Sequence, residues 1–397
     1  MRVYLDNAAT TKMSSTAISA MLPYFNEIYG NPSSLHTPGQ LAAEALADAR
    51  ARVARVIGAA QPREIYFTSG GSEADNQAIV SAARFGARKG KKHLISTSFE
   101  HHAVLHTLEA LEKEGFEVTL LDVGSQGLVT AEQVAAAIRP DTALVTIMYA
   151  NNEIGTVQPI ADIGKVCRER GVLFHTDAVQ AAGHLPIDVQ AQNIDLLSLS
   201  GHKFHGPKGV GVLYARTGIL LQNLIYGGAQ ERGKRAGTEN IPGIMAMTAA
   251  LEEAVANLEE TNRKMTVLRD RLIEGLSEIE HGILNGSREH RLPGNVSFCF
   301  EGIEGESLLL LLDDKGISAS SGSACTSGDL DPSHVLLAIG RPHEIAHGSL
   351  RLSLSGETTA EEVEYAIGAV KEVVAYLRSI SPVWRDLMNG KSEFIIK

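Results

Sequence analysis

The fold of this chain is decided by the segment Ile194-Asp-Leu-Leu-Ser-Leu-Ser-Gly-His-Lys-Phe-His-Gly-Pro-Lys-Gly-Val-Gly211. Residues 194–200 form an apolar run that is typical of a buried strand, and the remainder is a turn rich in glycine and proline. Lys203 lies on this turn at the end of the strand, where its amine can be desolvated. Because a desolvated amine loses its proton more readily, Lys203 is a candidate nucleophile.

An acidic residue follows the preceding strand. The run Gly171-Val-Leu-Phe-His-Thr176 leads directly into Asp177-Ala-Val-Gln180. Asp177 could simply cap a helix, since aspartate favours that position. However, a lysine and an acid at the ends of successive strands are what a pyridoxal phosphate site requires. The lysine forms a Schiff base with the cofactor, and the acid keeps the pyridine nitrogen protonated.

Strand-like and helix-like patterns alternate from about residue 60 to residue 215. This alternation predicts an α/β fold with a mainly parallel sheet covered by helices. Ligands bind beyond the carboxyl ends of the strands in such sheets, and Asp177 and Lys203 both lie at such ends. The expected strands are 64–69, 92–97, 116–122, 142–149 and 172–176, and the expected helices are 103–114, 131–138 and 160–170.

The C-terminal part of the chain has a different pattern. A long helix is expected over residues 243–279, followed by strands and helices typical of a smaller α+β domain. We therefore expect three parts. They are an N-terminal segment 1–15 that can pack on the small domain, a large α/β domain 16–260, and a small α+β domain 261–397.

Composition restricts the classes of function. The 397 residues are 44% hydrophobic and 21% charged, which is ordinary for a globular protein of two or three domains. The formal net charge of −11 disfavours binding to nucleic acids or anionic membranes. No apolar run is long enough to span a bilayer, and the N-terminus lacks the pattern of a signal peptide. Three cysteines are too few for a disulfide framework, so we expect a soluble cytoplasmic protein.

A second cluster of small polar residues, Thr68-Ser-Gly-Gly-Ser-Glu73, joins a strand to a helix. The free N–H groups of a helix start, together with hydroxyl groups, can bind a phosphate. Ser72 could equally be a plain helix cap. Ser200 and His202, beside the lysine, can add donors to the same phosphate. The chain contains neither a Walker motif nor a dinucleotide-binding Gly-x-Gly-x-x-Gly motif, which disfavours nucleotide-binding folds.

Histidines follow another strand in Glu100-His-His-Ala-Val104. The ring of His101 or His102 could stack on a pyridine ring and transfer protons near neutral pH. These two residues also permit a metal site, together with His175, His202 and His205. Their spacing matches no familiar zinc pattern, so no metal is expected.

Cys325 lies in Ser318-Ala-Ser-Ser-Gly-Ser-Ala-Cys-Thr-Ser-Gly-Asp329, which has neither helical nor strand periodicity. A cysteine is usually a small buried apolar residue, and Cys167 and Cys299 fit that description. Cys325 does not, because small polar residues surround it. An exposed thiol on a loop of this kind is a candidate nucleophile.

These segments together resemble the cysteine desulfurases of the NifS/IscS family, over nearly the whole chain. The long Ser/Gly segment around Cys325 is similar to the group that contains NifS and IscS, and the C-terminal residues 381–390 look more like NifS. The matching blocks, in family order, are Tyr4-Leu-Asp-Asn-Ala-Ala-Thr-Thr11, Gly30-Asn-Pro-Ser-Ser-Leu-His36, Ala150-Asn-Asn-Glu-Ile-Gly155, His175-Thr-Asp-Ala-Val-Gln180, Ser200-Gly-His-Lys203, Arg235-Ala-Gly-Thr-Glu-Asn240 and Ser320-Ser-Gly-Ser-Ala-Cys325.

The resemblance implies pyridoxal phosphate transferase fold type I and a role for each matching residue. Lys203 would carry the cofactor, Asp177 would pair with the pyridine nitrogen, and Gln180 would bind the phenolic oxygen. His101 would stack on the ring and move protons. The phosphate would be bound by Gly71, Ser72, Ser200 and His202, and by Thr238 of a neighbouring subunit; the substrate carboxylate would be bound by Asn152 and Arg351.

The implied reaction removes sulfur from L-cysteine, leaving L-alanine and a persulfide on Cys325. The implied partners are a second copy of the chain, in a homodimer, and a sulfur acceptor for iron–sulfur cluster assembly, such as a NifU/IscU-like scaffold. A selenocysteine lyase and a pyridoxal phosphate aminotransferase of the same fold stay open as alternatives. A non-catalytic metal-binding or sulfur-carrying scaffold is the alternative from another class.

Overall fold

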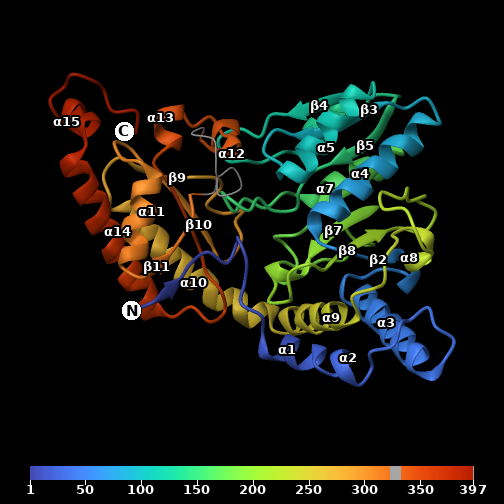
Figure 1. Cartoon of the computed structure of the whole chain (residues 1–397). Helices are drawn as coiled ribbons and strands as arrows, with labels where there is room; N and C mark the ends of the chain where they lie inside the picture. Colours follow the sequence, from blue (N-terminus) through green and yellow to red (C-terminus); the bar gives the residue numbers. More distant parts are fainter. Residues whose placement is uncertain (322–331, 397) are drawn as a thin grey trace.

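The computed structural model of the chain describes residues 1–321 and 332–396. Its larger part is built on a seven-stranded sheet with the order β2-β8-β7-β6-β5-β3-β4 (Figure 1). β8 alone runs opposite to the other six strands, so the predicted mainly parallel sheet is confirmed. The strands are β2 (Ile65–Thr68), β3 (His93–Thr97), β4 (Glu117–Leu121), β5 (Thr142–Thr146), β6 (Leu173–Asp177), β7 (Leu196–Ser200) and β8 (Gly211–Ala215).

Helices cover both faces of this sheet because successive apolar residues of each strand point to opposite sides. Leu144 and Leu196 pack under α4 (Gly71–Ala87) and α5 (His102–Lys113). The next residues along the same strands, Val145 and Leu197, belong to the apolar cluster on the other face. The helices that contribute to this second cluster include α3 (Thr37–Val56), α6 (Ala131–Ala137), α7 (Ile160–Arg170) and α9 (Ile241–Ala256).

A second layer, at the left of Figure 1, is built on a three-stranded antiparallel sheet with the order β12-β10-β9. Its apolar face packs against three helices, with α14 at the outer edge in the figure. The chain's N-terminus also joins this layer, because β1 (Val3–Tyr4) pairs parallel with β11 (Ile317–Ser318). The other elements are β9 (Gly282–Leu284), β10 (Asn295–Phe300), β12 (Ser349–Ser353), α10 (Leu258–Ser277), α11 (Gly305–Asp314) and α14 (Ala360–Ile380).

Short helices complete the fold, and none of the helices within residues 1–321 and 332–396 is long and apolar enough to cross a membrane. The short helices are α1 (Ser15–Met21), α2 (Pro23–Asn26), α8 (Gln230–Gly233), α12 (His334–Ala338), α13 (His343–Ala346) and α15 (Pro382–Met388).

The single long helix expected over residues 243–279 is wrong. The segment forms two helices, α9 and α10, which are separated at Asn257 (φ −100°, ψ 7°). The Asn257 side chain donates a hydrogen bond to the carbonyl oxygen of Glu253 at 3.0 Å. Asparagine competes with the helix backbone in this way, while the apolar pattern continues across the break and conceals it in the sequence.

Candidate active site

Lys203 and Asp177 lie at the same edge of the large sheet. β6 ends at Asp177, and its parallel neighbour β7 leads into a 3-10 turn that ends at Lys203. The Lys203 amine donates hydrogen bonds to the carbonyl oxygens of Ala8 and Ala9, at 2.7 and 2.8 Å. The structure therefore brings together the two residues on which the sequence-based cofactor prediction depends, and adds the N-terminal segment to them.

The carboxylate of Asp177 is almost fully buried, with 6% of the residue exposed. Residues 179–184 form turns and no helix begins after Asp177, so Asp177 is not a helix cap and that alternative is wrong. One carboxylate oxygen accepts the N–H of Val179 at 2.9 Å. Burial raises the pKa of Asp177, while His101 and Lys203 act in the opposite direction. A cation placed beside this carboxylate would offset the cost of its burial.

Of the two histidines after β3, His101 is the better candidate for the residue that stacks on the cofactor ring and transfers protons. Its Nδ1 accepts the N–H of Ala103 at 3.1 Å and so caps α5. The proton of a neutral His101 ring is therefore on Nε2, and the ring interacts electrostatically with Asp177. His102 lies instead among other histidines, His106 and His334, with ring centroids 5.0 and 4.5 Å away.

The predicted phosphate end is the start of α4. The helix begins at Gly71, and its N-cap, Gly70, offers no side-chain hydrogen bond. Ser72 is thus not the cap, contrary to the plain structural alternative, and it is exposed. A Cβ atom on Gly71 would lie 2.6 Å from Val179 Cγ2 and 3.6 Å from Ser200 Cβ. The uncapped N–H groups therefore lie close to the end of β7, where an anion would satisfy them.

The other predicted donors, Ser200 and His202, lie at the end of β7 and on the turn that follows it. Ser200 is buried at the end of β7. His202 Nδ1 lies 3.1 Å from the Thr10 hydroxyl, and burial, followed by the neighbouring Lys203 charge, lowers its pKa to about 4. A neutral His202 can donate from one ring nitrogen only. Ser72 and His101 line one cavity of about 410 Å³, so the phosphate end and the histidine face the same space.

Gln180 and the predicted substrate residues also converge on this edge. The Gln180 side chain donates to the Ala8 carbonyl at 3.0 Å. Arg351, on β12, reaches across from the smaller layer: its Nη1 donates to the Asn152 carbonyl at 3.2 Å, and its Nη2 lies 3.0 Å from the Asp6 carboxylate. Arg351 is 4% exposed. A buried guanidinium that contacts the same N-terminal segment as Lys203 is suited to binding the carboxylate of a small substrate.

The last two predicted residues are Cys325 and Thr238, the second of which was expected to reach a neighbouring subunit. Cys325 lies outside the described residues. Thr238 is exposed between α8 and α9, and within the described part of the chain no hydrogen bond joins it to the other predicted residues. Its segment is tied to α4 through Arg235, whose Nε lies 3.0 Å from the Glu73 carboxylate.

Sequence reasoning missed two buried carboxyl groups behind Asp177. Glu100 accepts the Met148 N–H at 3.0 Å with each carboxylate oxygen and the Thr97 hydroxyl at 2.7 Å, and burial raises its pKa to about 8. Burial, followed by repulsion from Asp177, raises the pKa of Asp75. Glu100 is therefore largely protonated at neutral pH. The position of Glu100 next to His101, and of Asp75 three residues after Ser72, was visible in the sequence, but the burial of the two carboxyl groups was not.

The histidines that were considered as metal ligands in the sequence have other partners or lie apart in the described part of the structure. His175 is fully buried, and its ring nitrogens lie 2.8 Å from the Thr146 hydroxyl and 3.0 Å from the Ser198 hydroxyl. Within the part of the chain that the structure describes, no three His, Cys, Asp or Glu residues are grouped to bind a metal ion.

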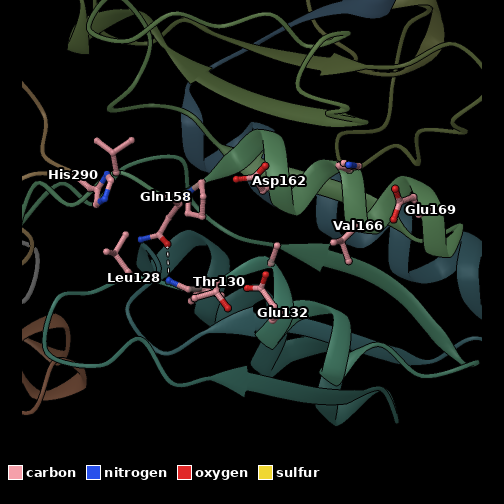
Figure 2. A pocket seen from close by; sticks show the side chains of 13 residues that line it. Leu128, Thr130, Glu132, Gln158, Asp162, Val166, Glu169 and His290 are labelled. Atoms are coloured by element: carbon pink, nitrogen blue, oxygen red, sulfur yellow. Dashed lines mark hydrogen bonds between the residues drawn. The ribbon is translucent and has the colours of Figure 1, made fainter.

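A further cavity, of about 550 Å³, lies apart from these residues between the start of α6 and α7 (Figure 2). Glu132 and Asp162 point toward it, and the Gln158 side chain at its wall accepts the N–H of Val129 at 2.9 Å. None of the predicted site residues lines this cavity.

The donor set at the sheet edge fits pyridoxal phosphate. The buried Asp177 carboxylate suits a protonated ring nitrogen, the Gln180 amide suits the phenolic oxygen, and the uncapped start of α4 suits a phosphate. The Lys203 amine lies at the same edge, where an aldehyde would need it.

Comparisons with known proteins agree with this fit. Residues 3–366 match the family model described as aminotransferase class-V. The chain is 52% identical to a cysteine desulfurase IscS of Clostridium botulinum over 99% of both chains. It is 56% identical to a cysteine desulfurase IscS of Methanosarcina thermophila, over 96% of this chain and 94% of the relative.

Solved structures give the same result. A NifS-like protein is 40% identical with a TM-score of 0.89, covering 95% of this chain and all of that one. A structure of SspA in complex with cysteine is 39% identical with a TM-score of 0.78, covering 90% of this chain and all of that one. IscS and NifS-like names both occur, so the preference for the NifS branch stays a prediction. By fold, site and similarity, the chain belongs to the cysteine desulfurases of the class-V aminotransferase family.

Proposed function

We propose that this protein uses pyridoxal phosphate to remove sulfur from L-cysteine. The observation that carries the proposal is the meeting of Lys203 and Asp177 at one sheet edge with Arg351, which reaches the same place from the smaller layer. A lysine, a buried acid and a carboxylate-binding arginine are the groups that an amino acid substrate and this cofactor need together.

Bound pyridoxal phosphate supplies an aldehyde that bonds to amines and a ring that withdraws electrons. Asp177 maintains the positive charge of that ring. Arg351, with Asn152 beside it, binds the substrate carboxylate and thereby orients the α-carbon toward Lys203. The Lys203 amine removes the α-proton, and His101 moves protons at the face of the ring through Nε2.

The sulfur step needs the Cys325 thiolate as nucleophile. A bond forms between Cys325 Sγ and the substrate sulfur, and the bond between that sulfur and the substrate Cβ breaks, with the electron pair going to carbon. Protons delivered to the carbons then complete the product. One L-cysteine and one Cys325 thiol therefore give one L-alanine and one Cys325 persulfide, with no external oxidant.

The decisive assay incubates the cofactor-loaded protein with L-cysteine and no amino acceptor, and measures alanine and sulfane sulfur. Equal amounts of the two products are expected. Amino transfer that requires a keto acid would indicate an aminotransferase instead, and a strong preference for selenocysteine would indicate a selenocysteine lyase. A colourless protein with stoichiometric metal would refute all of these in favour of a scaffold.

The proposed working unit is a homodimer in which Thr238 reaches the phosphate of the other subunit. Large apolar side chains that a second copy would cover support this arrangement, among them Tyr29 (70% exposed), Leu35 (93%) and Tyr226 (78%). Sedimentation velocity is expected to show a dimer at micromolar concentration. A monomer at all concentrations tested would refute shared sites.

The proposed sulfur acceptor is a NifU/IscU-like scaffold for iron–sulfur clusters, and the proposed location is the cytoplasm. The free buried thiols of Cys167 and Cys299 are compatible with a reducing compartment. Transfer of radiolabelled sulfur from Cys325 to the cysteines of such a scaffold is the expected result. Retention of all label on the enzyme would refute this choice of acceptor.

A further inference from the structure

Residues 6–11, here called the crossing segment, connect the two layers across the site. At one end, the Ala8 N–H donates to the Ser353 hydroxyl at 2.8 Å, and Asp6 pairs with Arg351 on the same strand. At the other end, the Thr11 N–H donates to the His202 carbonyl at 3.0 Å. The crossing segment thus contacts both the predicted substrate arginine and the turn that carries the lysine.

The three donor positions of Arg351 are used unequally. Nη1 donates to the Asn152 carbonyl and Nη2 to the Asp6 carboxylate. Nε is buried and finds no acceptor among the residues that the structure describes. Nε and Nη2 form the edge of a guanidinium that can bind both oxygens of a carboxylate. Asp6 therefore occupies half of that edge, and the other half is left without an acceptor.

We propose that Asp6 is a placeholder for the substrate carboxylate on Arg351, and hence a specificity-determining residue of the site. This inference rests on the proposed function, in which Arg351 binds an amino acid. Asp6 neutralises the buried guanidinium between turnovers, and the incoming carboxylate takes its place on Nη2 while also satisfying Nε. A buried charge without a partner is strongly unfavourable, so Arg351 needs such a partner before the substrate arrives.

The geometry allows this exchange without moving the backbone. The Asp6 side chain is 21% exposed, so the displaced carboxylate can turn into water. Its backbone is fixed independently, because Asp6 forms a parallel bridge with Ser353 and its carbonyl oxygen accepts the N–H of Ala9 at 3.0 Å. Rotation of the Asp6 side chain alone is therefore sufficient to free the Nη2 of Arg351 for the substrate.

Removing the Asp6 carboxylate, which competes with the substrate carboxylate for Arg351, tests the proposal. In the cofactor-loaded full chain, Asp6→Asn and Asp6→Ala are titrated with L-alanine, and binding is measured by the absorbance of the bound cofactor. L-alanine is expected to bind about 5- to 20-fold more tightly than to the unaltered protein, because a charge-assisted hydrogen bond no longer has to be broken. The affinity for ethylamine, which is alanine without its carboxylate, is expected to differ by less than about twofold between these variants and the unaltered protein.

Two further variants serve as controls. Asn7→Ala removes the neighbouring hydrogen bond from the Asn7 side chain to the Ser353 carbonyl, 2.8 Å long, and so loosens the crossing segment without freeing Arg351. Asp6→Glu retains a carboxylate and is expected to bind L-alanine no more tightly than the unaltered protein. If Asp6→Ala does not fold, the isosteric Asp6→Asn alone decides.

The proposal is overturned if L-alanine binds Asp6→Asn with equal or lower affinity. It is also overturned if ethylamine or Asn7→Ala shows the same gain, since the effect would then not arise at Arg351. Binding of L-alanine requires no desulfuration. A protein that binds alanine more tightly as Asp6→Asn but releases no sulfur from cysteine would therefore refute the proposed function and leave the placeholder intact.

Discussion

Lys203 and Gln180 donate hydrogen bonds to a single acceptor, the carbonyl oxygen of Ala8, at 2.7 and 3.0 Å. One backbone atom near the N-terminus therefore sets the relative position of two side chains that lie on the turns after two different strands, β6 and β7. Because a lysine ammonium is stabilised by carbonyl oxygens, this acceptor also gives the amine a defined resting place near the ring site.

Replacing the lysine tests the cofactor assignment. In the unaltered protein, borohydride is expected to fix the cofactor to the one peptide that contains Lys203. Lys203→Ala is expected to lower kcat by at least about a thousandfold, because both the covalent attachment and the general base are lost. The exposed Lys208 on the same turn supplies the control, and Lys208→Ala should retain labelling. Labelling of any other peptide would contradict the assignment.

The substrate role of Arg351 is tested by a change that retains its charge. Arg351→Lys is expected to raise the KM for L-cysteine about 10- to 100-fold with a smaller effect on kcat, since the planar fork is lost. Steady-state kinetics measure this split. Arg341, which donates to Asn285 at 2.8 Å outside the site, provides a matched Arg341→Lys control. An unchanged KM in Arg351→Lys would rule out the carboxylate contact.

The nucleophile is tested by separating substrate binding from sulfur release. Cys325→Ala is expected to retain the absorbance change that L-cysteine produces in the bound cofactor, but to release no sulfane sulfur. Cys325→Ser should behave in the same way, because a hydroxyl is a poor nucleophile toward sulfur. Full sulfur release by either variant would show that another group attacks the substrate.

A pH-dependent stability effect is expected from Glu153. Its buried carboxylate is bonded by the Ser333 hydroxyl, and burial raises its pKa from 4.5 to about 7. The folded state therefore binds more protons than the unfolded chain in this window, so the contribution of Glu153 to stability falls as pH rises from 4.5 to about 7.

The glutamine in Glu153→Gln does not ionise, so the loss of stability with rising pH that comes from Glu153 is absent in this variant. The free energy of unfolding of Glu153→Gln, relative to the unaltered protein, should rise by about 1–3 kcal/mol between pH 4.5 and pH 7. Urea denaturation at a series of pH values measures it. Glu112→Gln, at an exposed glutamate on α5, is the control and should show a flat difference. A flat difference for Glu153→Gln as well would contradict the raised pKa.

The close approach at the phosphate end gives a paired prediction. Gly71→Ala places a methyl group 2.6 Å from Val179 Cγ2, so we expect a loss of about 1–3 kcal/mol in stability from overpacking. Val179→Ala opens the space, and the double variant should recover most of that loss. Thermal denaturation measures both. A double variant less stable than Gly71→Ala would show that another contact requires the glycine.

Elements with strong periodicity were predictable from the sequence. The expected helix 160–170 coincides with α7, and the expected strand 172–176 differs from β6 by one residue at each end. These segments follow from local patterns, because apolar spacing alone specifies them. The break at Asn257 was missed for the same reason, since the apolar spacing continues through it.

The site was predictable only where a residue lies at the end of a strand or within a few residues after it. Asp177, His101 and Lys203 could be placed in this way, because parallel strands bring their carboxyl ends to one edge. The contacts of Asp6 and Ala8 could not, because they depend on the packing of the chain's first residues against strands hundreds of positions away. Nor could the burial of Glu100, which depends on the layers that close over it.

The pairing of β1 with β11 has a consequence for synthesis on the ribosome. Val3 pairs with Ile317, and Asp6 meets Arg351 across 345 positions of sequence. Val3 and Asp6 must therefore wait without these partners until the more than 300 residues that separate them from Ile317 and Arg351 have been translated. Contacts of such high sequence separation form late, so nascent chains that stall before residue 317 should lack a completed lysine environment and depend on chaperones until release.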